Sequence, residues 1–218
     1  VEGVLNQTTL PVDQRDKILT ITKQFASKGY RMLAVGRSDY SDQKFPLSQQ
    51  EFEFQFLGLI GFYDPPKKNI AATLQKFYKA GIEVKMITGD YTETAVAIAE
   101  QIEMKKGTGI LTGDKVIEMN DRELREQVRK VNIFARMFPA AKLKVIEALK
   151  ANGEVVAMTG DGVNDGPALK AAHIGIAMGK RGSEVAKNAA SLVLVDDDLF
   201  NMTEAVALGR RIYENLKK

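Results

Sequence analysis

Two aspartates and two glycines stand together directly after a short apolar run. The sequence TGDGVND, residues 159–165, follows residues 155–158, which have the length and composition of a buried strand. In open α/β sheets ligands gather at the carboxyl ends of strands, and Mg²⁺ prefers oxygen ligands such as carboxylates. Glycine lets backbone N–H groups approach a phosphoryl oxygen closely. The run therefore indicates a phosphate or magnesium site; the alternative is an ordinary Asp- and Gly-rich turn.

Two more polar residues stand where such a site would need them. Thr88 follows the predicted strand 82–87 and offers a hydroxyl and a nearby backbone N–H to a phosphoryl oxygen. Lys142 stands near the start of a predicted helix, where a cation opposes the helix dipole. This misfit favours a functional role for Lys142 over that of a surface lysine.

The long run TGDGVNDGPALKAAHIGIAMG (159–179) resembles the cation-transporting P-type ATPases, which belong to the haloacid dehalogenase superfamily of aspartyl-phosphate enzymes. Three further motifs resemble the same family in the same order: DPPK at 64–67, TGD at 88–90, and AR at 135–136 followed by PAAK at 139–142. The resemblance covers essentially the whole chain. The GFYDPPK and GDGVNDGPALK runs look most like the calcium or sodium/potassium-type branch.

The resemblance implies a role for each residue of a phosphoryl-transfer site that uses Mg²⁺. Asp161 is expected to be the Mg²⁺ ligand, and Thr88 to contact the phosphoryl group. Lys142 is expected to neutralise that group and to bridge to the acidic turn. Asn164 is expected to help bind the phosphate, and Asp165 to hold Lys142 and the local hydrogen-bond network.

A second set of residues is expected to bind ATP. Arg31 occupies the position of an arginine that contacts nucleotide phosphate in relatives, although a solvated strand arginine is the alternative. Gly89 and Asp90, together with Thr88, are expected near the junction of nucleotide and phosphate. Arg136 is assigned to nucleotide binding with Lys142. These assignments follow from the resemblance.

The sequence also departs from the family pattern. The family's nucleophile is the aspartate of a DKTGT motif, and this sequence contains no such motif. The GDKV segment at 113–116 lacks the threonines, so we reject it as a substitute. The TGE loop of the actuator domain is absent as well. We therefore expect the chain by itself to be inactive as an ATPase.

Alternating helix and strand patterns after residue 66 predict an α/β fold with a mainly parallel sheet. By resemblance this is a three-layer, Rossmann-like phosphorylation domain over 64–200 that lacks its nucleophile strand. Residues 1–63 resemble the C-terminal part of an α+β nucleotide-binding domain, and 201–218 the start of a stalk helix that leads to a membrane span. Strands are predicted at 30–35, 55–62, 82–87, 133–137, 155–158, 174–179 and 191–195, with a polar loop at 38–46 and a loop-rich insert after residue 102.

Composition narrows the classes of function. The formal net charge of +3 is too small to argue for nucleic acid, and 44% hydrophobic with 27% charged residues is ordinary for a globular protein. With no cysteine, disulfides and Cys-based zinc sites are excluded. The single histidine, His173, is interpreted as a surface or packing residue. The longest apolar runs are strand length, so we interpret the chain as a soluble piece from the cytoplasmic face of a membrane protein.

The leading hypothesis is a catalytic portion of a P-type ATPase that couples ATP hydrolysis to cation transport, with calcium the favoured ion. Its expected partners are ATP and the remainder of the pump: nucleophile strand, actuator domain and membrane helices. One alternative is a soluble haloacid dehalogenase-type phosphatase, and another is a non-catalytic Mg²⁺-binding or interaction fragment. The resemblance implies that the nucleophile strand lies between the strands that end near Thr88 and Asp161. Without it two apolar edges should stay unpaired, which predicts low stability, aggregation or strand-swapped self-association.

Overall fold

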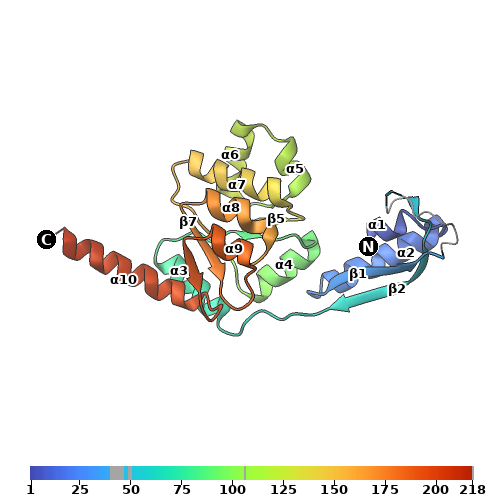
Figure 1. Cartoon of the computed structure of the whole chain (residues 1–218), viewed down its shortest axis with the longest axis horizontal. Helices are drawn as coiled ribbons and strands as arrows, with labels where there is room; N and C mark the ends of the chain where they lie inside the picture. The colour runs from blue at the N-terminus through green and yellow to red at the C-terminus, as the bar shows by residue number, and fades with distance from the viewer. Residues whose placement is uncertain (40–46, 49–50, 106, 218) are drawn as a thin grey trace.

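The computed structural model describes residues 1–39, 47–48, 51–105 and 107–217. An N-terminal part is joined by an extended segment to a larger α/β part, and the last helix projects away from it (Figure 1). The α/β class with parallel sheets that the sequence predicts is confirmed. The predicted loop at 38–46 lies largely outside the described residues.

The N-terminal part is a two-stranded antiparallel sheet with helices packed against it. Strand β1 (Arg31–Arg37) pairs with β2 (Gln55–Phe62), and helices α1 (Glu2–Leu5) and α2 (Val12–Ala26) contact β1. Helix α2 ends before Gly29, whose φ of 87° suits glycine. Both strands lie within two residues of the predicted ranges 30–35 and 55–62.

The larger part contains two separate parallel sheets of three strands each. The first has the order β3 (Met86–Ile87), β5 (Ile133–Ala135), β4 (Ile110–Thr112). The second has the order β6 (Ala157–Gly160), β7 (Ile174–Met178), β8 (Leu192–Leu194). Within the described residues β3 pairs only with β5, and β6 only with β7. Each therefore has one unpaired edge, as the sequence predicts.

Most strands differ from the prediction by one or two residues at an end, and β3 and β6 differ most. Strand β3 is confined to Met86–Ile87 within the predicted 82–87, because its only partner, β5, matches it over two residues. Strand β6 begins at Ala157, two residues later than predicted. The backbone of Val156 is instead used by His173, whose N–H donates to the Val156 carbonyl and whose Nδ1 accepts the Val156 N–H.

The segment predicted as a loop-rich insert is structured, which corrects the sequence interpretation. It contains β4 and helix α5 (Gly113–Glu118). Leu111 and Val116 from these elements are buried in the main core. A Cβ on Gly113 would lie 2.6 Å from the Arg136 carbonyl oxygen, so only glycine fits there. Elements this short carry too little periodicity to be recognised from sequence.

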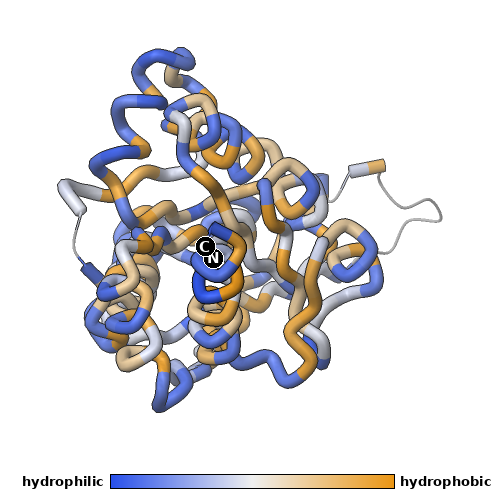
Figure 2. Tube along the Cα trace, turned by 90° about the vertical axis from the view of Figure 1, so that its left-hand side faces the viewer, coloured by the Kyte–Doolittle hydropathy of each residue, from blue (hydrophilic) through white to orange (hydrophobic). Residues whose placement is uncertain are grey.

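The parallel strands alternate with helices that supply most of the core. These are α3 (Ile70–Lys79), α4 (Thr92–Gln101), α6 (Asp121–Lys130), α7 (Pro139–Ala151), α8 (Gly166–Ala171) and α9 (Glu184–Ala189). Helix α7 contacts α5, α6 and α8, and its Val145 and Ile146 are fully buried next to Phe134 of β5. Hydrophobic and hydrophilic residues alternate along the helices (Figure 2), as expected for helices with one buried face.

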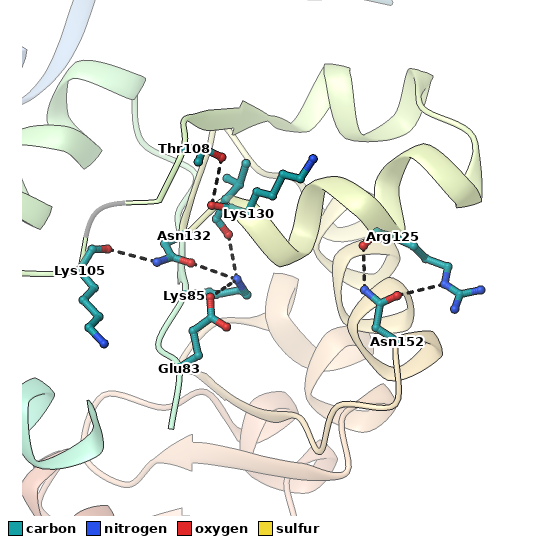
Figure 3. A network of polar contacts seen from close by, with 9 residues as sticks. Glu83, Lys85, Lys105, Thr108, Arg125, Lys130, Asn132 and Asn152 are labelled. Carbon is teal, nitrogen blue, oxygen red and sulfur yellow. Dashed lines mark hydrogen bonds and ion pairs between the residues drawn. The ribbon is translucent and has the colours of Figure 1, made fainter. Parts of the chain in front are cut away.

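A polar network at the amino-terminal edge of the first sheet compensates for the shortness of β3 (Figure 3). The Lys85 ammonium donates to the Val131 carbonyl at 2.9 Å, to Asn132 Oδ1 at 3.0 Å and to Glu83 Oε1 at 2.8 Å. The Asn132 amide in turn donates to the Lys105 carbonyl at 3.2 Å. These bonds hold the chain before β3 against β5 where the ladder itself is absent.

The last helix, α10 (Phe200–Leu216), packs on the rest of the molecule only through its first part. It contacts α3 there, and no residue of α10 is buried. None of the helices in the described part of the chain is both long and apolar enough to cross a membrane.

Candidate active site

The carboxyl ends of β3 and β6 line one pocket of about 430 Å³. Residues 87–90 form one wall, and residues 158–161 form the other. Lys142, Asp165, Arg31 and Met178 complete the lining. A groove of about 530 Å³ between α3 and α10 contains none of the residues of the acidic turn. The pocket lies where the two unpaired strand edges end.

An ion pair forms the base of this pocket. The Lys142 Nζ lies 2.7 Å from Asp165 Oδ1, and the two side chains are only 13% and 10% exposed. Lys142 comes from the first turn of α7, which starts at Pro139, and Asp165 from the 3₁₀ helix η2 (Val163–Asp165). The other carboxylate oxygen of Asp165 accepts the Gly162 N–H at 3.1 Å. Both carboxylate oxygens of Asp165 are thus held in place, one by the Lys142 ammonium and the other by the Gly162 N–H.

Gly160 and Gly162 make this turn possible. A Cβ on Gly160 would lie 2.6 Å from the Asp165 Cβ, so any side chain there would displace the carboxylate. The Gly162 amide is the donor that orients Asp165. The glycines flank Asp161, so close backbone packing fixes the acidic turn.

Asp161 presents an exposed carboxylate at the end of β6. Among the described residues no group hydrogen-bonds this carboxylate, whereas the Asp161 carbonyl accepts the Ser183 N–H at 2.8 Å. Mg²⁺ is commonly bound by one or two carboxylates together with waters and substrate phosphates, and an uncommitted carboxylate fits that requirement. No cluster of three or more His, Cys, Asp or Glu suited to a metal occurs in the described part of the chain. Asn164 is exposed on η2 and does not line the pocket.

Thr88 and Asp90 form a closed local hydrogen-bond pair. The Thr88 hydroxyl donates to Asp90 Oδ2 and accepts the Asp90 N–H, both at 3.1 Å. The Thr88 N–H donates to the Phe134 carbonyl of β5, so it is already used. Gly89 lines the pocket, and its N–H has no acceptor among the described residues, so it is an available backbone donor.

Arg31 and Arg136 have different surroundings. Arg31 lines the pocket, and its Nε lies 3.6 Å from Asp90 Oδ1, with the arginine side chain 69% exposed. Arg136 does not line the pocket: its Nη2 lies 3.1 Å from Glu2 Oε2, and its guanidinium lies over the Tyr91 ring. Burial, followed by the Glu2 carboxylate, raises the pKa of Tyr91 above its usual value. The structure therefore brings Arg31, but not the Arg136 side chain, to the site.

Several residues that line or support the pocket escaped the sequence argument. Met158, Met178 and Ile87 supply an apolar wall, and the Ser183 amide supports Asp161 from behind. Ser183 caps α9 by accepting the Ala186 N–H, and a serine before a helix was the available signal. His173 is exposed and acts through its bond to Val156, in agreement with a surface or packing role.

A family model described as haloacid dehalogenase-like hydrolase matches residues 12–173. The chain belongs to this family. Among curated relatives it is 41% identical to calcium-transporting ATPase 1 of Saccharomyces cerevisiae over 94% of the chain, and 42% identical to the calcium-transporting ATPase of Bacillus subtilis over 91%. It is also 41% identical over 96% of its length to calcium-transporting ATPase type 2C member 1 of Bos taurus. The chain spans 21–22% of the length of these three relatives.

Proposed function

We propose that this haloacid dehalogenase-like chain is part of the catalytic portion of a P-type ATPase that transports calcium. In this assignment residues 1–63 belong to a nucleotide-binding domain, 64–200 to the phosphorylation domain, and 201–218 to the start of a stalk helix. The larger protein is embedded in a membrane, with these residues at its cytoplasmic face. ATP is the phosphoryl donor.

One observation carries the proposal. Strands β3 and β6 each have an unpaired edge, and their carboxyl ends line a single pocket that contains Lys142 and Asp161. A strand inserted parallel between them would deliver its C-terminal residue into this pocket. We propose that a segment outside this sequence supplies that strand and ends in the nucleophilic aspartate. The pocket residues, among them Lys142 and Asp161, would then surround this aspartate.

The proposed reaction is phosphoryl transfer in two steps. An oxygen of the incoming carboxylate bonds to the γ-phosphorus of ATP while the bond to the β,γ-bridging oxygen breaks and ADP leaves. Water later attacks the same phosphorus, which regenerates the carboxylate and releases phosphate. Such reactions depend on positioning and on neutralising charge at the transferred group.

The residues of this chain supply both. The Lys142 ammonium, fixed by Asp165, neutralises phosphoryl oxygens, and the Gly89 amide donates to them from the opposite wall. The Thr88 hydroxyl joins it by turning its hydrogen from Asp90 Oδ2 to a phosphoryl oxygen. Arg31 is exposed at the mouth, where it can leave Asp90 for a nucleotide phosphate. Asp161 would hold Mg²⁺, which supplies positive charge to the phosphoryl oxygens when bound.

Calcium as the transported ion rests on the names of the relatives, because ion ligands of a pump lie outside this sequence. Three relatives at 41–42% identity are calcium-transporting ATPases. Calcium-dependent phosphorylation of the full-length protein by ATP tests this point. Phosphorylation that requires sodium instead would overturn the choice of ion.

The catalytic assignment is tested by acid-stable labelling with γ-labelled ATP and Mg²⁺. The chain alone should take up no hydroxylamine-sensitive label, because among the described residues no carboxylate belongs to a strand inserted between β3 and β6. The full-length protein should be labelled, and Asp161→Asn or Lys142→Ala should nearly abolish labelling while nucleotide binding is retained. Asp196→Asn, which alters an exposed aspartate outside the pocket, is the matched control. Label on an aspartate within residues 1–218 would refute the proposal.

A further inference from the structure

Asp197 makes an unusual set of contacts for a residue in a surface turn. Its backbone is left-handed, with a φ of 57°, and its carboxylate accepts the N–H groups of Lys180 at 2.9 Å and Arg181 at 3.0 Å. Partial burial raises the pKa of this carboxyl, but the hydrogen bonds from the 179–181 backbone outweigh it and lower the pKa overall. The carboxylate is thus a fixed acceptor for the loop after β7.

That loop leads directly to the acidic turn. A Cβ on Gly182 would clash with the Met178 carbonyl oxygen, so the loop packs tightly on the end of β7. One residue later, the Ser183 N–H donates to the Asp161 carbonyl at 2.8 Å. A shift of the loop would therefore move the Asp161 backbone, and the Asp161 carboxylate would move with it.

Asp197 also contacts the extended segment 64–69 that joins the two parts of the molecule. The Lys67 ammonium donates to the Asp197 carbonyl. Beside it, the Asn69 amide donates to both carboxylate oxygens of Asp198, at 3.0 and 3.1 Å. Asp198 further accepts the Phe200 N–H at the start of α10. The turn therefore joins the connecting segment, the loop after β7 and the last helix, and Figure 1 shows α3 beside the start of α10.

We propose that Asp197 is a positioning residue that couples the connecting segment 64–69 to the Asp161 turn. The path is continuous: Lys67 to the Asp197 carbonyl, the Asp197 carboxylate to the 180–181 amides, and Ser183 to Asp161. Movement of the N-terminal part on its connection thereby alters the placement of the Mg²⁺ ligand. The functional consequence rests on the proposed phosphoryl-transfer activity.

The charge and both carboxylate oxygens of Asp197 are required. Asparagine tolerates the left-handed backbone, so Asp197→Asn leaves the turn conformation accessible. It has only one acceptor oxygen, and its NH₂ group would face one of the two N–H donors. Hydrogen bonds to charged groups are stronger than those between neutral groups. Asp197→Asn therefore weakens the contacts that hold residues 180–181, and the loop after β7 becomes less tightly held.

The first test is residue-resolved hydrogen exchange by mass spectrometry on this chain. In Asp197→Asn the amides of Lys180, Arg181 and Ser183 should exchange roughly tenfold faster. Asp196→Asn, whose native carboxylate accepts the Asn201 amide, should change none of them. Lys67→Met should accelerate the same amides to a smaller extent. If Ser183 stays protected in both Asp197→Asn and Lys67→Met, the coupling does not exist.

The second test is the Mg²⁺ dependence of phosphoenzyme formation in the full-length protein. Asp197→Asn should raise the Mg²⁺ concentration for half-maximal labelling roughly tenfold and regain most of the labelling at saturating Mg²⁺. A merely structural role would lower the amount of active protein without moving this midpoint, and an unmoved midpoint overturns the proposal. If Asp197→Asn does not fold, Lys67→Met must shift the midpoint in the same direction. Absence of labelling in the unaltered protein would instead refute the proposed function, and the exchange result would then decide the coupling alone.

Discussion

Removal of the Lys142 ammonium should destabilise the fold more than removal of any other lysine of α7. In Lys142→Met the volume of the side chain is nearly kept, but Asp165 is left ionised and only 10% exposed without its partner. At the observed 2.7 Å, and with an effective dielectric constant of about 20, the attraction is about 6 kcal/mol. Burial of the two charges costs several kcal/mol each, so the net contribution of the intact pair is small.

The expected loss of stability is large because the substitution removes only one partner of the ion pair. Breaking one side of a buried pair costs about 3–5 kcal/mol, since the remaining charge keeps its desolvation penalty. For a chain of this length that loss corresponds to a melting temperature lower by roughly 6–20 °C. Urea unfolding followed by circular dichroism measures the change in the free energy of unfolding, with an unchanged slope as the check on comparable end states.

Two further variants isolate the pair. The double variant Lys142→Met/Asp165→Asn removes both charges, so it should be more stable than the sum of the single changes predicts, by about 2–3 kcal/mol. Lys150→Met is the matched control: it lies on the same helix, but its ammonium donates to the exposed Ala171 carbonyl, and its loss should cost under about 1 kcal/mol. A Lys142→Met protein within about 1 kcal/mol of the unaltered chain would refute the reasoning.

Three other predictions follow from named contacts. The chain should self-associate through the open edges of β3 and β6. Val155 lies beside β6 and is 80% exposed, so Val155→Lys should shift analytical ultracentrifugation profiles toward monomer. A monodisperse, monomeric unaltered chain would contradict this prediction. The backbone N–H of Phe200 lowers the pKa of Asp198. The ionised Asp198 therefore stabilises the fold above about pH 4, the pKa of the unfolded chain, and this stabilisation is lost as the pH falls through the lowered folded pKa. Asp198→Asn should weaken the dependence of the free energy of unfolding on pH in this acidic range. His173→Gln should be close to neutral in thermal unfolding, whereas His173→Ala, which removes the acceptor for the Val156 N–H, should cost about 1 kcal/mol; equal losses would argue against that bond.

Long periodic elements were predictable because their pattern is local. Strand β2 matches the predicted 55–62, and strand β7 lies within the predicted 174–179. The short pieces β4 and α5 were missed, since three to six residues carry almost no periodicity and their burial depends on distant partners. Likewise the length of β3 is set by its pairing with β5, which covers two residues, and a local sequence pattern contains no information about that pairing.

Candidate chemistry was visible in residue types alone. The order of strand, glycines and aspartates around Asp161, and a lysine at the wrong end of a helix, pointed to one phosphate site before any distance was known. Only the fold decided which of these groups meet. It pairs Lys142 with Asp165, leaves the Asp161 carboxylate uncommitted, and turns Arg136 toward Glu2 and away from the pocket.

The sequence by itself determined the fold class and the residues at the strand ends, because hydrophobic spacing and turn chemistry act over a few neighbours. The tertiary structure decided the rest. Which edges of β3 and β6 stay open depends on the strands that pair with them, and Asp197 reaches residues 64–69 through its contact with Lys67, 130 residues away in the sequence. Such contacts are set by the packing of the whole chain, and no short stretch of sequence encodes them.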